Sequence, residues 1–307
     1  MRLLLCCLCL LAQAVMAAPQ RFELEQREKS QQFRYQFEFA QQPQVLSFTL
    51  QDEVLNNHFR QFRAFKANLI RQYLWRDLRA HVAKYPTAQL SRHPDKTQLS
   101  YRLKVSDPTL LAQLDSELKQ LLLKQQQFYL QQSYHTTLSL PLGETVIIPD
   151  HVRFMHESLN DLLPVATALH QKLANIDSRT SLQYISQWIQ QIPYQDLTDR
   201  RLSDGLSYSP PLKLLRENRG DCDSKSVLLA ALLRLLLPDV KLAMVYLPEH
   251  AMLAVHLPVT ASDMTVTIEG RDYLLVDPTG PALLAPGEIA AQYRIYTENG
   301  QFAYLLF

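Results

Sequence analysis

The sequence predicts an α+β protein, in which helices and antiparallel strands occupy separate stretches of the chain. Three observations carry this prediction. Residues 227–237 are apolar except for Arg234, which is typical of a helix buried on all sides. Residues 33–39 alternate aromatic and polar side chains, as a strand with one buried face does. Residues 241–276 are short apolar runs separated by turn residues, which favours an antiparallel sheet.

Residues 1–17 form a predicted signal peptide. Arg2 precedes an apolar run, and small residues favour cleavage after Ala17. The run is too short to span a bilayer, and no later apolar run is long enough to anchor the mature chain. We therefore expect an exported protein, periplasmic or secreted, with no transmembrane anchor.

Removal of this leader changes the cysteine count and leaves the charge balanced. Cys6, Cys7 and Cys9 lie in the leader, so the mature chain keeps Cys222 alone. A lone thiol in an oxidising compartment has no disulfide partner, which favours a use for its reactivity. The chain has 31 basic and 30 acidic residues, and one basic residue, Arg2, leaves with the leader. This balance argues against a nucleic-acid partner.

Residues 18–149 are expected to form an α+β domain with two long helices. Its predicted elements are a hairpin of strands 33–39 and 45–50, a helix over 52–85, a strand over 99–105, a helix from 108 to about 132 and an extended segment over 137–148. The first helix has a basic face, which is typical of a solvated surface and also of a partner-binding site. Three roles stay open for this domain: covering the site, binding a protein partner, or a structural role.

Residues 150–307 are expected to form a second domain that carries the chemistry. Helices are predicted over 151–174, with a kink or break at Pro164, and over 181–191, and a polar loop over 200–211. A turn at 218–220 and a capping Asp221 then place Cys222 at the first position of the buried helix. Because the N-terminal end of a helix favours an anion, we expect the pKa of this thiol to be lowered. The pattern predicts a nucleophilic cysteine, the alternative being a small buried apolar residue.

His250 begins one predicted strand and Asp277 ends another. A cysteine nucleophile needs a base that takes its proton, and the base needs a third group that orients it. Histidine and a carboxylate suit these two roles. A plain meander would place His250 and Asp277 at opposite ends of the sheet. The hypothesis therefore requires their two strands to pair directly, with residues 264–268 as an excursion that turns back near 269–272.

Neither a metal nor a cofactor is expected. His250 and His256 would share a strand face, but about 20 Å of strand would separate them, which is too far to bind one ion. For the developing oxyanion, the backbone N–H of Cys222 is one candidate donor. Tyr194 or Gln195 is a candidate for the second.

Three segments resemble the sequence blocks of the bacterial transglutaminase-like superfamily. They read Arg219-Gly220-Asp221-Cys222-Asp223-Ser224-Lys225, His250-Ala251-Met252-Leu253-Ala254-Val255 and Tyr273-Leu274-Leu275-Val276-Asp277-Pro278-Thr279. Ile192-Pro193-Tyr194 also resembles the segment that precedes the cysteine block in this family. The resemblance covers residues 150 to about 290.

The resemblance implies a papain-like core, in which a cysteine-bearing helix packs on an antiparallel sheet that carries the histidine and the aspartate. It implies a peptidase, amidase or acyl transferase that acts on peptide or protein amide bonds through Cys222, His250 and Asp277. Some members of the superfamily have lost activity, so an inactive binding or scaffold module is the alternative. Ala251 stands where an aromatic residue often follows the histidine.

Overall fold

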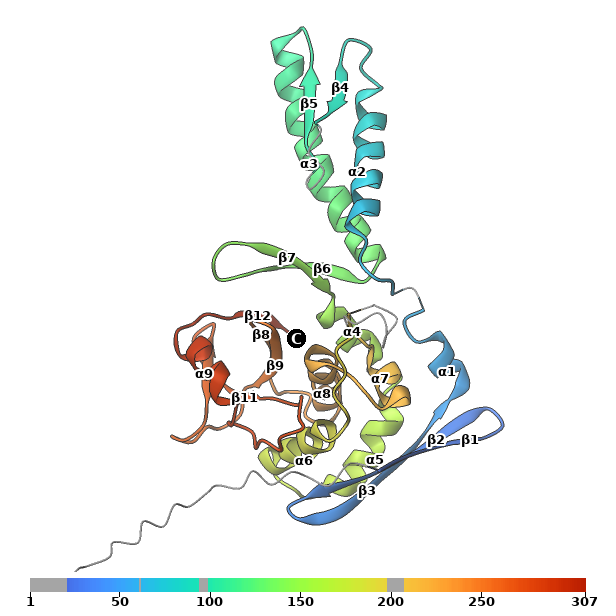
Figure 1. Cartoon of the computed structure of the whole chain (residues 1–307), viewed down its shortest axis with the longest axis vertical. Coiled ribbons are helices and arrows are strands. Elements are labelled where there is room, and N and C mark those ends of the chain that lie inside the picture. Colours follow the sequence, from blue (N-terminus) through green and yellow to red (C-terminus); the bar gives the residue numbers. More distant parts are fainter. Residues whose placement is uncertain (1–20, 61, 94–98, 198–206) are drawn as a thin grey trace, which may run out of the picture. The chain divides into compact units, whose positions relative to one another are not determined.

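The computed structural model describes residues 21–60, 62–93, 99–197 and 207–307. The predicted signal peptide and most of the predicted loop at 200–211 lie outside the described residues. The described chain is a mixed α/β protein, and each pair of neighbouring strands in its sheets is antiparallel (Figure 1). Within the described ranges, every helix is too short or too polar to traverse a lipid bilayer.

The chain forms two compact units. The first contains residues 21–58, 155–196 and 209–307, and the second contains the described parts of 59–154 and 197–208. Residues 21–58, predicted as part of the N-terminal domain, therefore belong to the same compact unit as Cys222, His250 and Asp277.

A three-stranded sheet opens the first unit. Its strands, in spatial order, are β1 (Arg21–Gln26), β2 (Ser30–Phe39) and β3 (Gln42–Gln51). The predicted hairpin of β2 and β3 is confirmed, and it turns at Ala40 and Gln41, which both have positive φ. The alternation in β2 buries Phe33, Tyr35 and Phe37 on one face. β1 escaped prediction because most of its residues are exposed on both faces, which leaves no apolar period to detect.

The first unit is built around one buried helix, α8 (Cys222–Leu236), against which α5 (Leu163–Leu173), α6 (Ser178–Gln190) and α7 (Pro211–Glu217) pack. α1 (Asp52–Asn57) contacts β3, and α9 (Ala291–Glu298) contacts the strand Thr265–Ile268. Residues 224–233 of α8 are all buried, which confirms the prediction for 227–233, whereas 234–237 at the end of the apolar run are half-buried. The helix expected over 151–174 is two helices, α4 (His151–Ser158) and α5, and Pro164 lies in the first turn of α5.

A five-stranded sheet packs against α8 and carries His250. Its strands are β8 (Leu242–Leu247), β9 (His250–Val255), β10 (Thr265–Ile268), β11 (Arg271–Val276) and β12 (Ala303–Leu306), in the spatial order β10-β11-β9-β8-β12. β11 pairs directly with β9, with Val276 opposite Leu253. β10 lies outside β11, joined to it by a turn at Glu269 and Gly270. The direct pairing that the hypothesis requires is therefore confirmed.

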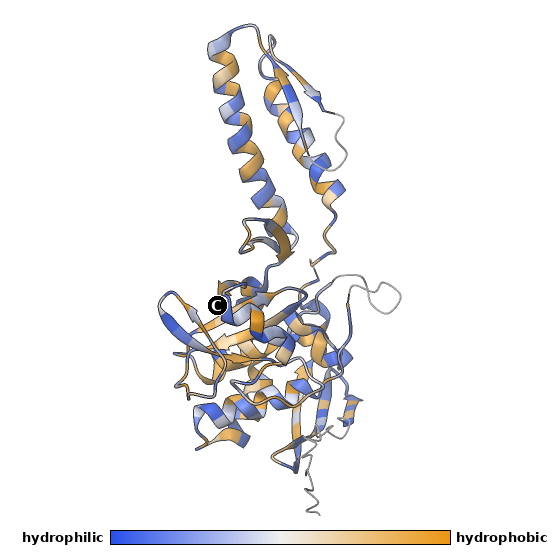
Figure 2. Cartoon of the chain, turned by 60° about the vertical axis from the view of Figure 1, so that its left-hand side comes forward, coloured by the Kyte–Doolittle hydropathy of each residue, from blue (hydrophilic) through white to orange (hydrophobic). Residues whose placement is uncertain are grey.

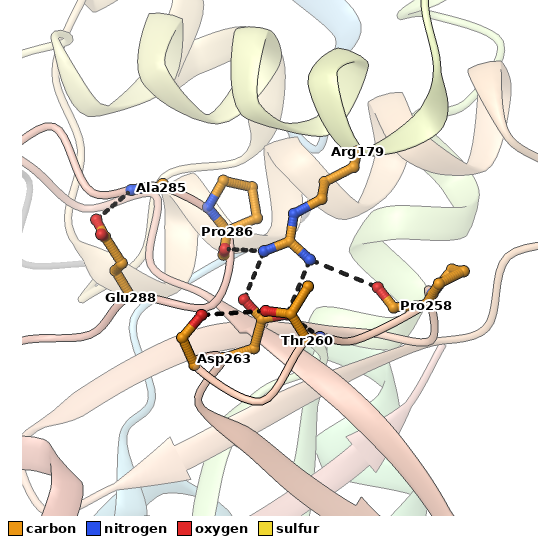
Figure 3. Close-up of polar contacts among 8 residues, drawn as sticks. Arg179, Pro258, Thr260, Asp263, Ala285, Pro286 and Glu288 are labelled. Carbon is orange, nitrogen blue, oxygen red and sulfur yellow. Dashed lines mark hydrogen bonds and ion pairs between the residues drawn. The ribbon is translucent and has the colours of Figure 1, made fainter.

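An ion pair holds the segment that leads from β9 into the excursion at residues 264–268 (Figure 3). The guanidinium of Arg179 on α6 donates to both carboxylate oxygens of Asp263, at 2.9 and 2.6 Å, and to the Pro286 carbonyl at 2.8 Å. The backbone N–H of Thr260 also donates to Asp263, at 2.6 Å. These bonds lower the pKa of Asp263 to about 2, and the hydrogen bond from Arg179 is the largest cause. A bidentate pair of this kind ties the excursion to α6.

The second unit consists of paired helices and two hairpins. Its elements are α2 (Ala67–Val82), β4 (Gln89–Arg92), β5 (Tyr101–Lys104), α3 (Pro108–Gln132), β6 (His135–Ser139) and β7 (Thr145–Pro149). Figure 2 shows apolar and polar stretches alternating along α2 and α3, as expected for helices with one buried side. Leu78, Val82 and Leu118 form a buried cluster between them.

The prediction of one helix over residues 52–85 is wrong. α1 ends at Asn57, and α2 begins at Ala67. Phe59 has a φ of 47°, which a helix does not allow, and its ring packs edge-to-face on Phe154. Phe62 makes a second edge-to-face contact with the same ring. Phe59 and Phe62, whose spacing suggested one continuous helix, instead pack in an aromatic cluster around Phe154.

Candidate active site

The turn between α7 and α8 places Cys222 at the start of α8, and the segment of Tyr194 lies alongside this turn. Asn218 ends α7 in the left-handed conformation, and the carboxylate of Asp221 caps α8 by accepting from the Ser224 N–H at 3.2 Å. The strand-like bridge between Tyr194 and Gly220 lies alongside this turn. Its bonds run from the Gly220 N–H to the Pro193 carbonyl, 3.2 Å, and from the Gln195 N–H to the Gly220 carbonyl, 3.1 Å. The segment containing Tyr194 therefore borders the cysteine turn.

His250 and Asp277 meet where the start of β9 lies beside the end of β11, two inner strands of the five-stranded sheet. The His250 Nε2 and the Asp277 Oδ2 are 2.9 Å apart, and the two side chains are only 7% and 8% exposed. The direct pairing of β9 with β11 produces this contact between residues 27 positions apart. The bond to Nε2 leaves Nδ1 as the ring nitrogen that can exchange a proton with another group.

The ring of Tyr293 stacks on His250. The two ring centroids are 4.2 Å apart and the planes differ by 3°. Tyr293 lies on α9, so the stack and the bond to Asp277 together orient the imidazole. Sequence reasoning missed Tyr293, since an aromatic residue on a short surface helix gives no signal for such a contact.

The sulfur of Cys222 lies beside the residue that follows His250. It accepts hydrogen bonds from the backbone N–H groups of Ala251 and Asp223. The described contacts of the His250 ring are with Asp277 and Tyr293. A hydrogen bond between the Cys222 sulfur and the His250 ring is not among the described contacts of either residue.

The expectation of a lowered pKa at Cys222 is wrong for this resting arrangement. Burial raises the pKa of the thiol well above its usual range, and the charges of Asp223 and Asp221 raise it further. The two backbone N–H groups act in the opposite direction but are outweighed. The resting form of Cys222 at neutral pH is therefore the thiol.

Asp221, which is buried, and Asp223, which is half-buried, lie on either side of Cys222 in the chain. Both accept from the backbone N–H of Ser224, at 3.2 and 2.8 Å, and their carboxyls are hydrogen-bonded to each other. Burial is the largest cause that raises the pKa of each, and that of Asp221 rises most. Each carboxyl is therefore easier to protonate than an exposed aspartate, and Asp221 more so than Asp223.

The segment after Asp277 is held from several sides. The Thr279 N–H donates to the Asp277 Oδ1 at 3.0 Å, and the Gln190 side chain donates to the Asp277 and Leu284 carbonyls at 2.7 and 3.0 Å. Gly280 has a φ of 69°, and a Cβ there would lie 2.0 Å from the Gln190 carbonyl oxygen, so this position requires glycine. Burial raises the pKa of Asp277, but the hydrogen bond and charge of His250 outweigh it, so the net shift is downward.

Lys225 is completely buried one turn after Cys222. Its Nζ donates to the carbonyls of Ile192 and Thr279, each at 2.5 Å. Burial lowers its pKa to about 7 against the opposing charges of Asp277, Asp221 and Cys222. The sequence assigns Lys225 no role beyond its place in the segment Arg219 to Lys225. Its position at the start of an apolar helix is the signal that could have predicted its burial.

The two candidates for the second oxyanion donor lie near the site. Tyr194 is 52% exposed, and its pKa is raised to about 12, by burial first and then by the charges of Cys222 and Asp221. Gln195 is the next residue, and its backbone N–H donates to the Gly220 carbonyl beside the cysteine turn. The role of either as an oxyanion donor stays a prediction.

The geometry brings a half-buried thiol at a helix N-terminus to the backbone beside an oriented histidine–carboxylate pair. These are the groups that nucleophilic acyl transfer uses. Searches against protein-family models, curated proteins and solved structures find no match to this chain.

Proposed function

We propose that this chain is an exported cysteine enzyme that acts on peptide or protein amide bonds, with a papain-like, transglutaminase-like arrangement of Cys222, His250 and Asp277. The single observation that carries the proposal is the buried 2.9 Å bond between His250 and Asp277. A carboxylate on one ring nitrogen holds the imidazole in the tautomer whose other nitrogen can accept a proton.

The chemistry follows from a resting thiol. As the sulfur of Cys222 attacks the carbonyl carbon, the thiol proton passes to Nδ1 of His250. The imidazolium then returns this proton to the leaving amine as the C–N bond breaks, which leaves a thioester. Water or a second amine attacks the thioester, gives a proton to His250, and releases the acid or the new amide along with the Cys222 thiolate, which His250 reprotonates. Asp277 stabilises the imidazolium in each half of the reaction.

This sequence requires the sulfur to leave the Ala251 N–H and reach Nδ1 of the neighbouring residue. Rotation about the Cα–Cβ bond of Cys222 is the movement we infer, because hydrogen bonds of catalytic groups commonly tighten only in the presence of substrate. The same observation supports the second candidate function. A thiol that stays on the backbone N–H, with a raised pKa, suits an inactive binding or scaffold module.

Acylation by p-nitrophenyl acetate separates the two functions. Attack by Cys222 on this activated ester forms acetyl-cysteine and releases p-nitrophenolate, which absorbs visible light, and mass spectrometry locates the acetyl group. For an enzyme, we expect one equivalent of nitrophenolate per chain and a rate that falls about 100-fold or more in the His250→Ala variant, because general base catalysis contributes about 10²–10⁴.

The matched control is His256→Ala. His256 follows the same strand, and its ring bonds to the Asp272 carbonyl away from the thiol. Its variant should acylate at the rate of the unmodified sequence. Equal rates for the His250→Ala variant and the parent chain would reject the enzyme and leave the binding module.

A further inference from the structure

Lys225 is a charged side chain for which the proposed chemistry has no use. It lies on α8 three residues after Cys222 and is fully shielded from solvent. A buried ammonium loses its hydration and remains in a fold only where other contacts compensate. An apolar side chain of similar size would avoid this cost, so the contacts that Lys225 makes need an explanation.

Its two acceptors belong to the two backbone segments on either side of the site. Ile192 precedes the segment of Pro193 to Gln195 that borders the cysteine turn. Thr279 gives its N–H to the Asp277 carboxylate while its carbonyl accepts from Lys225. One side chain on the cysteine helix thus binds the segment beside the nucleophile and the segment that holds the acid.

This geometry relates Lys225 to the orientation of His250. The Asp277 Oδ1 accepts from Thr279 and the Oδ2 bonds to His250, so a shift of the Thr279 backbone rotates or withdraws the carboxylate. The amine keeps two N–H donors after it loses a proton, so both carbonyls stay bound across neutral pH.

We propose that Lys225 is a positioning residue of the candidate active site, which holds the Asp277 carboxylate against His250 through the backbone of Thr279. The inference rests on the proposed function, because it assigns a role in the same acyl transfer. Lys225 itself touches neither the substrate nor the reacting atoms.

A double-mutant cycle on the full mature chain tests this role. The acylation rate with p-nitrophenyl acetate is measured for the parent, Lys225→Met, Asp277→Asn and the double variant, with thermal unfolding of each. Methionine keeps the volume and removes the charge and both donors. We expect Lys225→Met to acylate about tenfold or more slowly, because small misplacements of catalytic groups have effects up to about 10²-fold.

The proposal is decided by whether the effects of Lys225→Met and Asp277→Asn on the acylation rate are additive. If Lys225 acts through Asp277, the double variant is no slower than Asp277→Asn alone. A purely structural lysine would lower the melting temperature and leave the acylation rate unchanged, or would add its effect to that of Asp277→Asn; either result overturns the proposal. Leu232→Met, a buried volume-conserving change two turns along α8, is the control and should keep the parent rate.

The remaining outcomes separate this inference from the function on which it rests. Slow acylation in Asp277→Asn and His250→Ala, with the parent rate in Lys225→Met, overturns the role of Lys225 alone. Parent rates in all three overturn the enzyme itself. Should Lys225→Met not fold, Lys225→Leu, which also removes the charge and both N–H donors, replaces it in the cycle. Loss of folding in both, with Leu232→Met folded, makes Lys225 a requirement of the fold and overturns a role specific to the site.

Discussion

At the scale of single residues, the surroundings of Cys222 determine which protonation state begins the reaction. The start of α8 favours an anion, but burial and the neighbouring carboxyls of Asp221 and Asp223 act more strongly on the thiol. The proposed enzyme therefore needs His250 to take the proton during attack and has no preformed thiolate. The raised pKa of Cys222 should therefore be measurable as a change in the pH dependence of its reaction with an alkylating reagent.

We expect the rate of alkylation of Cys222 by iodoacetamide to keep rising with pH beyond the range in which a free thiol levels off. Iodoacetamide reacts with the thiolate, and the raised pKa moves its formation above the ordinary value of about 8.5. The same chain unfolded in guanidinium chloride is the control and should titrate near that ordinary value. A folded-state midpoint below about 7 would contradict the resting thiol and indicate a thiolate–imidazolium pair.

At the scale of elements, the contact between Arg179 and Asp263 ties α6 to the excursion that lets β9 and β11 pair directly (Figure 3). Without that excursion, His250 and Asp277 would lie at opposite ends of the sheet. The pair is also the part of this region whose contribution to stability depends on pH in a predictable direction.

We expect Arg179→Met to lower the free energy of unfolding by about 1–2 kcal/mol at pH 6, the range for hydrogen bonds to a charged group that is partly exposed. The pKa of Asp263 is lowered in the folded chain, so its contribution is complete above the unfolded value of about 4 and is lost as pH falls towards about 2. The difference between the two chains in urea unfolding should therefore shrink between pH 4 and pH 2.

Arg21→Met supplies the comparison for this measurement. Arg21 pairs with Glu23 at 3.0 Å, but its side chain is 73% exposed, so its removal should change the free energy of unfolding by less than about 0.5 kcal/mol. A difference for Arg179→Met that stays constant from pH 6 to pH 2 would mean that the ion pair does not set the stability of the excursion.

At the scale of the whole molecule, the first three strands are part of the unit that holds the site. Tyr35 on β2 is fully buried, packs edge-to-face on Trp188 and donates to the Leu215 carbonyl at 2.7 Å. Gln191 and the backbone of Glu38 exchange two further hydrogen bonds, at 2.9 and 2.8 Å. These contacts join the N-terminal sheet to α6, α7 and the residue after α6.

A chain that begins at residue 150 should therefore lose cooperative folding, although it contains Cys222, His250 and Asp277. The loss of β2 and β3 exposes the buried surface of α6 that carries Trp188, and we expect dye binding and loss of the near-ultraviolet circular dichroism signal. A chain that begins at residue 27 lacks only β1, most of which is exposed, and should keep a cooperative urea transition. Cooperative unfolding of the shorter chain would show that the sheet is dispensable.

The sequence by itself determined the elements whose burial is periodic. The apolar run of α8, the alternation in β2 and the cap at Asp221 are local patterns, and each appears in the structure where the pattern lies. The order of Cys222, His250 and Asp277 along the chain also predicted that they act as a set. It required the strands of His250 and Asp277 to pair directly. Where aromatic residues serve a cluster far along the chain, as Phe59 and Phe62 do, the same reasoning joined α1 and α2 wrongly.

Only the tertiary structure decided which residues contact one another around the candidate site. The stack of Tyr293 on His250, the two carbonyls bound by Lys225 and the place of β1–β3 in the first unit all join residues distant in sequence. The raised pKa of Cys222 is also tertiary, although Asp221 and Asp223 adjoin it in the chain. Neighbouring charges act weakly through water and strongly after burial, and burial depends on what the rest of the chain packs above them.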